Sequence, residues 1–168
     1  MIPNNLEPIL TKYFNAEKQE SLLFIVIAVM AFMVSFFLLR NGSSWKAAAY
    51  PLIAIGLIQL VVGSTIYFRT GKQVNTLLSK LHSEPVTFKT EESARMEKIM
   101  KNFKLYRYIE MALMIAGIYL FLQSSRDTSW YAAGIGLAIQ AGVMLIADLF
   151  AEERAKHYFA AIKEMIVS

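Results

Sequence analysis

Cysteine is missing from this 168-residue chain, and proline, histidine and tryptophan are scarce. Without cysteine there is no disulfide, no thiolate nucleophile and no cysteine-ligated metal. Charged residues make up only 18% of the chain, against 56% that are hydrophobic. This balance differs from that of an ordinary soluble domain and is typical of a membrane protein.

Signatures of the common enzyme classes are also missing. The sequence contains no HExxH motif, no P-loop and no G-x-S-x-G motif. The Glu-x-x-His pattern of di-iron helical bundles fails as well, because His157 follows Glu153 at four residues rather than three. We therefore predict no catalytic residue, no metal ligand and no cofactor. A cleaved secretory signal is not expected, because residues 1–20 are mixed in charge and the apolar run after them is long.

Four apolar runs are present instead, and they predict transmembrane helices at about residues 21–39, 47–68, 107–123 and 130–150. The first run, "SLLFIVIAVMAFMVSFFLL", carries no charge across nineteen residues. The third is cleanly apolar only from Met111 to Leu122, so it reaches spanning length only if it takes in Glu110.

Each predicted membrane helix continues into a more polar segment with an apolar stripe at helical spacing. The extensions cover about residues 4–20, 69–81, 90–106 and 151–166, and the segment "HSEPVTFKT" at 82–90 predicts a break with a new helix starting near Thr90. The stripes are Ile2, Leu6, Ile9, Leu10, Tyr13 and Phe14; Val74, Leu77, Leu78 and Leu81; Met96, Ile99, Met100, Phe103 and Tyr106; and Ala151, Ala155, Tyr158, Phe159, Ile162 and Ile166.

Four such stripes predict four faces that are buried together. The expected fold is a single-domain, all-α membrane protein, with four transmembrane helices in an up-down-up-down bundle that extends into the cytosol. For residues 2–14 an alternative is an amphipathic helix lying on the bilayer, with Pro8 at a bend.

Positive charge is unevenly distributed between the two predicted sides. Of seventeen Lys and Arg residues, only Arg40, Lys46 and Arg126 lie in the two short connections, and the other fourteen flank the opposite membrane face. This predicts that both termini and the middle turn are cytoplasmic. Acidic residues interleave with the basic ones, so nucleic acid is not an expected partner. Chain size, helix count and the stretch "RMEKIMKNFKLYRYIE" have the general look of small four-helix inner-membrane proteins of bacteria.

Small residues recur on two of the predicted membrane helices, where they allow close helix approach. Gly134, Ala138 and Gly142 are spaced by four residues, and Gly56 and Gly63 are one heptad apart. They predict tight helix packing and argue only weakly for a homo-oligomer.

Extending each stripe into the membrane at about 100° per residue turns several polar side chains inward. Depth counted from the connections predicts two layers. The interfacial layer is Glu17, Glu20, Tyr67, Arg107 and Asp148, and the deeper layer is Gln59, Glu110 and Gln140. Arg107 and the two amides are the expected partners of Glu110. The residues predicted to point outward are Arg69, Lys72, Glu153 and His157.

This inward set contains four carboxylates and one cation, Arg107. Carboxylates without a counter-charge must be protonated, solvated or bound to a cation. Two interpretations follow: a structural network that fixes helix register, or a site for a cation, proton or ligand.

Three functions are compatible with the sequence. The first is a non-catalytic inner-membrane protein that binds a protein partner on its cytosolic half, as an accessory or assembly subunit or an immunity-type protein. The second is an oligomeric channel or carrier for a small cation or protons that uses the interior carboxylates. The third is a membrane enzyme that binds a metal through carboxylates.

Overall fold

The computed structural model describes residues 6–41 and 44–166, which form four long α-helices and no strand. The helices are α1 (Leu6–Arg40), α2 (Ala49–Ser83), α3 (Pro85–Gln123) and α4 (Ser129–Glu164), and a 3₁₀ helix, η1 (Ser44–Ala48), leads into α2. All four are long and apolar enough to cross a membrane. The prediction of an all-helical protein with four potential membrane helices is therefore confirmed. Ile2, in the first predicted stripe, lies outside the described residues.

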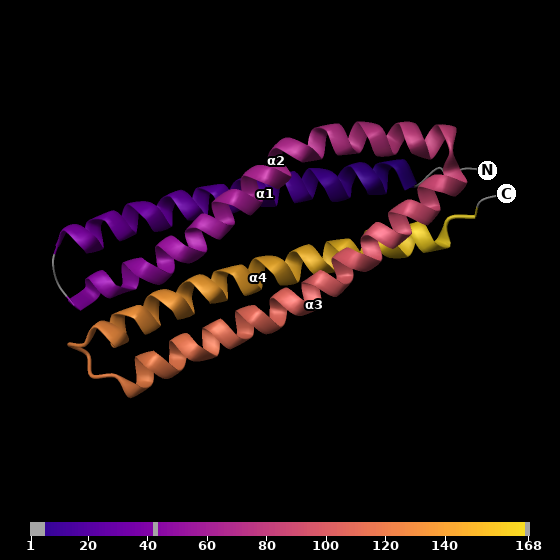
Figure 1. The fold of residues 1–168 in the computed structure, drawn as a ribbon. Coiled ribbons are helices and arrows are strands. Elements are labelled where there is room, and N and C mark those ends of the chain that lie inside the picture. Colours follow the sequence, from indigo (N-terminus) through magenta and orange to yellow (C-terminus); the bar gives the residue numbers. More distant parts are fainter. Residues whose placement is uncertain (1–5, 42–43, 167–168) are drawn as a thin grey trace.

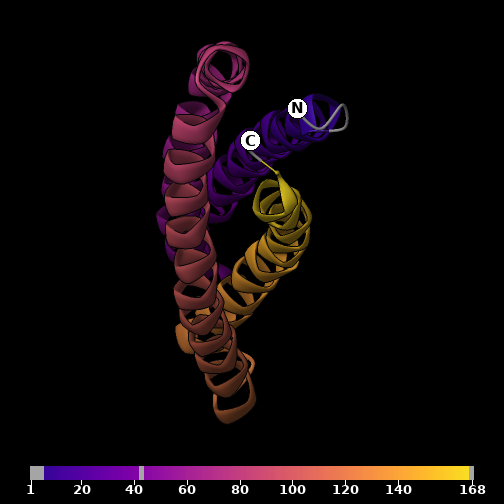
Figure 2. The ribbon, with the colours of Figure 1, turned by 90° about the vertical axis from the view of Figure 1, so that its right-hand side faces the viewer.

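The helices form two hairpins, α1–α2 and α3–α4, and most close contacts lie within each hairpin. The α1–α2 and α3–α4 connections lie at one end of the molecule, while the α2–α3 turn lies at the other (Figure 1). The start of α1 and the end of α4 are near each other at that second end in both ribbon views (Figures 1 and 2). The hairpins also touch through η1, which packs against α4.

The turn between α2 and α3 is much tighter than the sequence predicts. Helix α2 continues to Ser83, the single residue Glu84 makes the turn with φ −140° and ψ 65°, and α3 begins at Pro85. The expected start near Thr90 is thus about one turn late. Proline at a first helical position forfeits no hydrogen bond, because that N–H has no partner inside the helix, and its fixed φ suits the helix.

The apolar stripes of the polar segments meet in one core at the end that holds the α2–α3 turn. Leu10, Phe14, Leu81, Phe88 and Ile162 are fully buried there. Three members of the predicted stripes are exposed instead, namely Ile9, Tyr106 and Ile166. The stripes therefore predicted which face of each helix is buried, but they did not predict how far that buried face extends around or along the helix.

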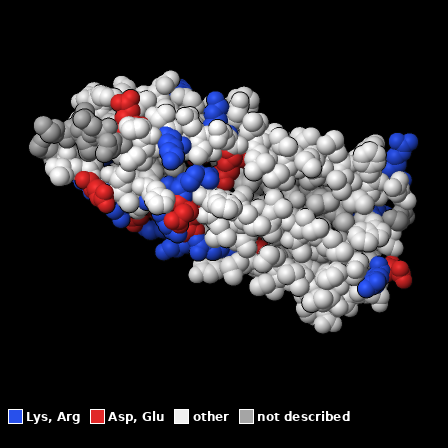
Figure 3. Space-filling view, turned by 180° about the vertical axis from the view of Figure 1, so that it is seen from behind, with Lys and Arg blue, Asp and Glu red and all other residues white. Residues whose placement is uncertain are grey.

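The other half of the molecule keeps its large apolar side chains on the outside. Phe36, Phe37, Val61, Ile115 and Leu122 are among those exposed there. On the face shown in Figure 3, charged side chains gather over the half with the α2–α3 turn, and the other half is uncharged except at its far end. This surface suits contact with lipid.

Backbones in this half approach each other through small residues. A Cβ added to Gly63 would lie 2.7 Å from the Ser21 carbonyl oxygen, and one added to Gly134 would lie 2.6 Å from the Phe121 amide nitrogen. Gly142 makes no such close approach, since the nearest atom to an added Cβ is Met114 Sδ at 3.9 Å.

Two further predicted small residues, Gly56 and Ala138, also lie at helix contacts. An added Cβ on Gly56 would meet the Phe32 ring at 3.1 Å, and the backbone nitrogen of Ala138 would lie 2.6 Å from a Cβ on Gly117. Gly117 was not predicted, nor was Gly136, where a Cβ would lie 2.8 Å from the Ala48 carbonyl oxygen. These small-residue contacts join helices of the same chain.

Candidate functional site

A cavity of about 660 Å³ lies among the four helices, where the charged half meets the apolar half. Its lining runs from Tyr13 to Phe24 on α1, from Ile55 to Arg69 on α2, from Ile99 to Leu113 on α3 and from Ala141 to Arg154 on α4. At 1.5 Å per residue the cavity extends about 20 Å along the helix axes.

The cavity brings together acidic residues that are distant in the sequence. Glu17 and Glu20 enter from α1, Glu110 from α3 and Asp148 from α4. Asp148 is an electrostatic neighbour of both Glu110 and Glu20. The four carboxylates therefore form one group that leads from the charged half toward the apolar half.

Glu110 is the most deeply buried acid of this group. Its side chain is 3% exposed, and apart from the neighbouring Asp148 carboxyl group neither carboxylate oxygen has a hydrogen-bond partner among the described residues. The predicted inward orientation of Glu110 agrees with this burial. The prediction that Arg107 is the partner of Glu110 is wrong, because Arg107 forms an ion pair with Glu152 on α4.

The antiparallel course of α3 and α4 explains that difference. Because the two helices run in opposite directions, residues that precede Glu110 on α3 lie beside residues that follow Asp148 on α4. Arg107 is therefore level with the part of α4 that leads to Glu152. Arg107 therefore extends away from Glu110, to an acid one turn beyond Asp148. Glu152 is 4% exposed and was not predicted as an interior residue. It also contacts Lys156 Nζ at 3.1 Å.

Only one of the four cavity carboxylates forms an ion pair among the described residues. Glu20 pairs with Arg154, an interior cation that the sequence reasoning missed although it lies four residues before Tyr158 of the apolar stripe. Glu17, Glu110 and Asp148 have no ion pair in this part of the chain. Glu17 precedes the predicted spanning segment, and burial raises the pKa of its carboxyl group, an effect that nearby Arg95 opposes.

One amide, Gln59, lines the cavity near its apolar end, and a second, Gln140, binds to it. Gln140 Nε2 donates a hydrogen bond of 2.6 Å to Gln59 Oε1, and both side chains are buried. Gln59 Nε2, which faces the same cavity, has no partner in the described part of the chain. On the far side of this pair, α4 packs tightly against η1 at Gly136.

Two other expectations for single residues differ from the structure. Tyr67 does not line the cavity, and the Lys18 ammonium instead lies 4.9 Å from the centre of its ring. Arg69 was predicted to point outward; it is exposed but lines the cavity mouth. Lys72, Glu153 and His157 are exposed as predicted.

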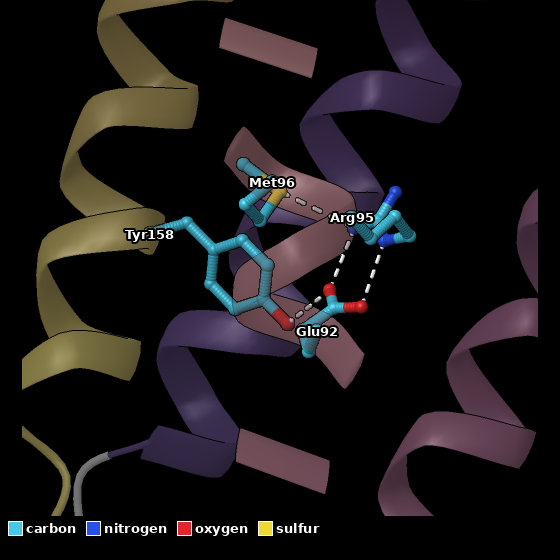
Figure 4. A network of polar contacts seen from close by, with 4 residues as sticks. All are labelled: Glu92, Arg95, Met96 and Tyr158. Carbon is cyan, nitrogen blue, oxygen red and sulfur yellow. Dashed lines mark hydrogen bonds and ion pairs between the residues drawn. The ribbon is translucent and has the colours of Figure 1, made fainter. Parts of the chain in front are cut away.

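A second buried polar network lies outside the cavity and was also missed. Arg95 donates two hydrogen bonds, of 2.7 and 2.6 Å, to the Glu92 carboxylate, and Tyr158 Oη donates a third of 2.9 Å (Figure 4). Glu92 lies two residues after the predicted helix start at Thr90 and was not among the predicted interior residues. It lies four residues before Met96 of the apolar stripe, and this spacing was the signal for its burial. Because every partner is present, this network is structural.

Residues 6–41 and 44–166 contain no group of three or more His, Asp or Glu side chains that are placed to hold a metal ion. The site is a cavity with an acidic row, the Gln59 amide and apolar walls.

Fold and site together define a helical protein with four helices able to cross a membrane and an acidic cavity between them. No family model, curated protein or solved structure matches this chain. The function is therefore argued from the cavity itself.

Proposed function

We propose that this chain is a multi-pass membrane protein that binds a cation in its acidic cavity. In the proposed orientation the helices run up-down-up-down through a bacterial inner membrane, and the half rich in Lys and Arg extends into the cytosol with both termini. The support for this orientation is the excess of Lys and Arg flanking one membrane face.

The observation that carries the proposal is the unpaired state of Glu110. A carboxylate at the centre of a bilayer costs about 3 kcal/mol on insertion scales, and a charge left without partners in protein is also costly. Glu110 is buried against a second acid, Asp148, and has no cation beside it, although the protein supplies arginines to Glu20, Glu92 and Glu152. A cation bound between Glu110 and Asp148 would provide the missing counter-charge.

The shape of the cavity favours a binding protein or carrier over an open pore. On the cytosolic side the acidic row continues to Glu17 and Glu20. On the other side the cavity lining ends on α4 at Ala141, and the buried Gln59–Gln140 hydrogen bond and the close contact at Gly136 lie there. Release on that side would require the two hairpins to move relative to each other, and most close contacts lie within the hairpins rather than between them.

Replacing Glu110 tests this function directly. Full-length protein in lipid nanodiscs is titrated with Na⁺, Ca²⁺ and methylammonium, and the unfolding temperature is followed. A bound cation at 100 times its Kd stabilises the folded state by about 2.7 kcal/mol, so we expect at least one of them to raise the unfolding temperature. Glu110→Gln and Asp148→Asn should abolish that rise.

The matched control is Glu153→Gln, which removes an exposed acid of α4 outside the cavity and should leave the cation response intact. A response that is the same in Glu110→Gln, Glu153→Gln and the unaltered protein would contradict the proposal. Cation flux into liposomes then separates a carrier from a protein that only binds.

Docking of a protein partner remains a second proposal for the cytosolic half. The buried core at that end, with Phe14, Leu81 and Phe88, makes it a rigid element that extends beyond the predicted spanning segments. Crosslinking in cells that recovers a discrete complex containing this half would support it.

A further inference from the structure

The cavity is much larger than the space that a proton or a single metal ion fills. Its volume is about 660 Å³. One water molecule accounts for about 30 Å³ in the liquid, and pockets that bind small organic molecules typically measure about 300 to 1,000 Å³. The volume therefore corresponds to an organic molecule.

The walls of the cavity are mostly apolar, and part of them faces outward. Phe24, Ile55 and Ala141 form a buried back wall from α1, α2 and α4. Val61 of α2 and Ile109 of α3 line the cavity and are nevertheless 64% and 48% exposed. The cavity therefore opens sideways between α2 and α3, at the level where the apolar half begins.

Polar groups without partners face this apolar space. Glu110 and Gln59 are more than nine-tenths buried and line the cavity. The Gln59 amide nitrogen has no hydrogen-bond partner among the described residues, and the Glu110 carboxylate has none apart from the Asp148 carboxyl group. Asp148 adds a second acid, whose carboxyl group lies within hydrogen-bonding reach of Glu110 and has no ion pair among the described residues. A ligand that suits this cavity has a positively charged group, which would lie against the acids, and an apolar remainder, which would lie against the apolar walls.

We propose that the occupant is an amphiphilic organic cation that enters from the lipid between α2 and α3. Its charged group contacts Glu110 and Asp148, and its body packs on the side chains around Val61 and Ile109. This inference rests on the proposed cation-binding function and adds the chemical class of the ligand and its route.

Binding of tetraphenylphosphonium to the full-length protein in nanodiscs tests the inference, with empty nanodiscs to subtract partition into lipid. Glu110→Gln should weaken binding about tenfold, because a charge-assisted contact is lost. Ile109→Trp should weaken it severalfold by filling the opening. Ile115→Trp is the matched control: it is also an exposed isoleucine of α3, but it does not line the cavity, so binding should not change.

The neutral compound triphenylphosphine oxide separates charge from shape and should not compete. Competition at equal concentration, or equal binding by the Glu110→Gln and Ile109→Trp variants and the unaltered protein, would overturn the inference. If Na⁺ or Ca²⁺ stabilises the protein through Glu110 while tetraphenylphosphonium does not bind, the inference fails and the proposed function stands. If no cation of either kind depends on Glu110, both fail.

Discussion

Glu92 and Glu110 are the same residue type on the same helix and are equally buried, at 2% and 3% exposure. They differ in their partners. Glu92 accepts hydrogen bonds from Arg95 and Tyr158, whereas in the described residues Glu110 has only another acid, Asp148, beside its carboxylate. A satisfied buried acid stabilises one arrangement of helices, while an unsatisfied one retains a capacity to bind. This contrast separates the structural acid from the candidate ligand.

Arg95→Met tests the structural role of the first network. It leaves Glu92 buried without its cation, and breaking a buried pair in this way costs about 3 kcal/mol of folding free energy. The free energy of unfolding in mixed micelles measures the loss. Adding Glu92→Gln to Arg95→Met should restore part of the stability, because the buried charge is then removed.

The control for this prediction is Lys101→Met, which breaks the exposed Glu97–Lys101 pair and should cost less than about 1 kcal/mol. Equal losses in the two methionine variants would show that Glu92 needs no counter-charge.

At the scale of helices, the two halves of the molecule are held together by different means. The charged half has a core of large side chains such as Phe14, Phe88 and Tyr158. The apolar half relies on close backbone contact at small residues, because lipid provides no hydrophobic force between helices. The cavity lies at the boundary between the two halves, where the helices are held apart and no side chain fills the space between them.

Two glycine substitutions should therefore have opposite effects. Gly134→Ala places a Cβ 2.6 Å from a backbone atom of α3 and must push the hairpin apart, so we expect a loss of stability of about 1 to 3 kcal/mol. Gly71→Ala meets nothing within 4 Å in the continuous helix α2, so the better helix propensity of alanine should add up to about 1 kcal/mol. Unfolding in mixed micelles measures both, and a loss from Gly71→Ala as large as that from Gly134→Ala would contradict this account.

Helical periodicity predicts which face of a helix is buried, but it does not predict which side chains meet. It gave the four helices, the core stripes and the inward orientation of Glu110, Gln59 and Gln140. It gave the wrong partner for Arg107, because the long arginine side chain reaches Glu152, which is one helical turn beyond Asp148 on α4. Pairing depends on helix rotation, on side-chain direction and on the tight turn at Glu84, none of which the apolar pattern specifies.

The charge pattern was predicted less completely than the apolar pattern. Glu92, Glu152 and Arg154 were left out of the interior because they sit in segments rich in exposed charges. Only their position relative to the stripes distinguishes them from neighbours such as Glu153. The surplus of acid in the cavity is smaller once the arginines are counted, but it remains. Arg95 and Arg107 pair with acids outside the cavity lining. The four cavity carboxylates face two lining arginines, Arg154, which pairs with Glu20, and Arg69 at the mouth.

For the whole molecule, the distribution of surface residues relates the cavity to a membrane. The half with exposed apolar side chains would lie in lipid and the charged half in the cytosol, so the acidic row would cross the boundary between them. A ligand could then reach the cavity from either phase. This arrangement requires the α2–α3 turn and the α3–α4 connection to lie on opposite sides of the membrane.

Single cysteines can test that arrangement, because the chain has none of its own. Ser83, the last residue of α2, and Ser125, in the α3–α4 connection, are exposed and lie just beyond the two ends of α3. In intact cells, a membrane-impermeant maleimide should label Ser125→Cys and should label Ser83→Cys only after permeabilisation, as the positive-inside rule predicts. Ile115→Cys, on the exposed apolar surface of α3, should react in neither condition and only after denaturation. Labelling of Ser83→Cys alone would reverse the orientation, and equal labelling of both serine positions in intact cells would show that α3 does not cross the membrane.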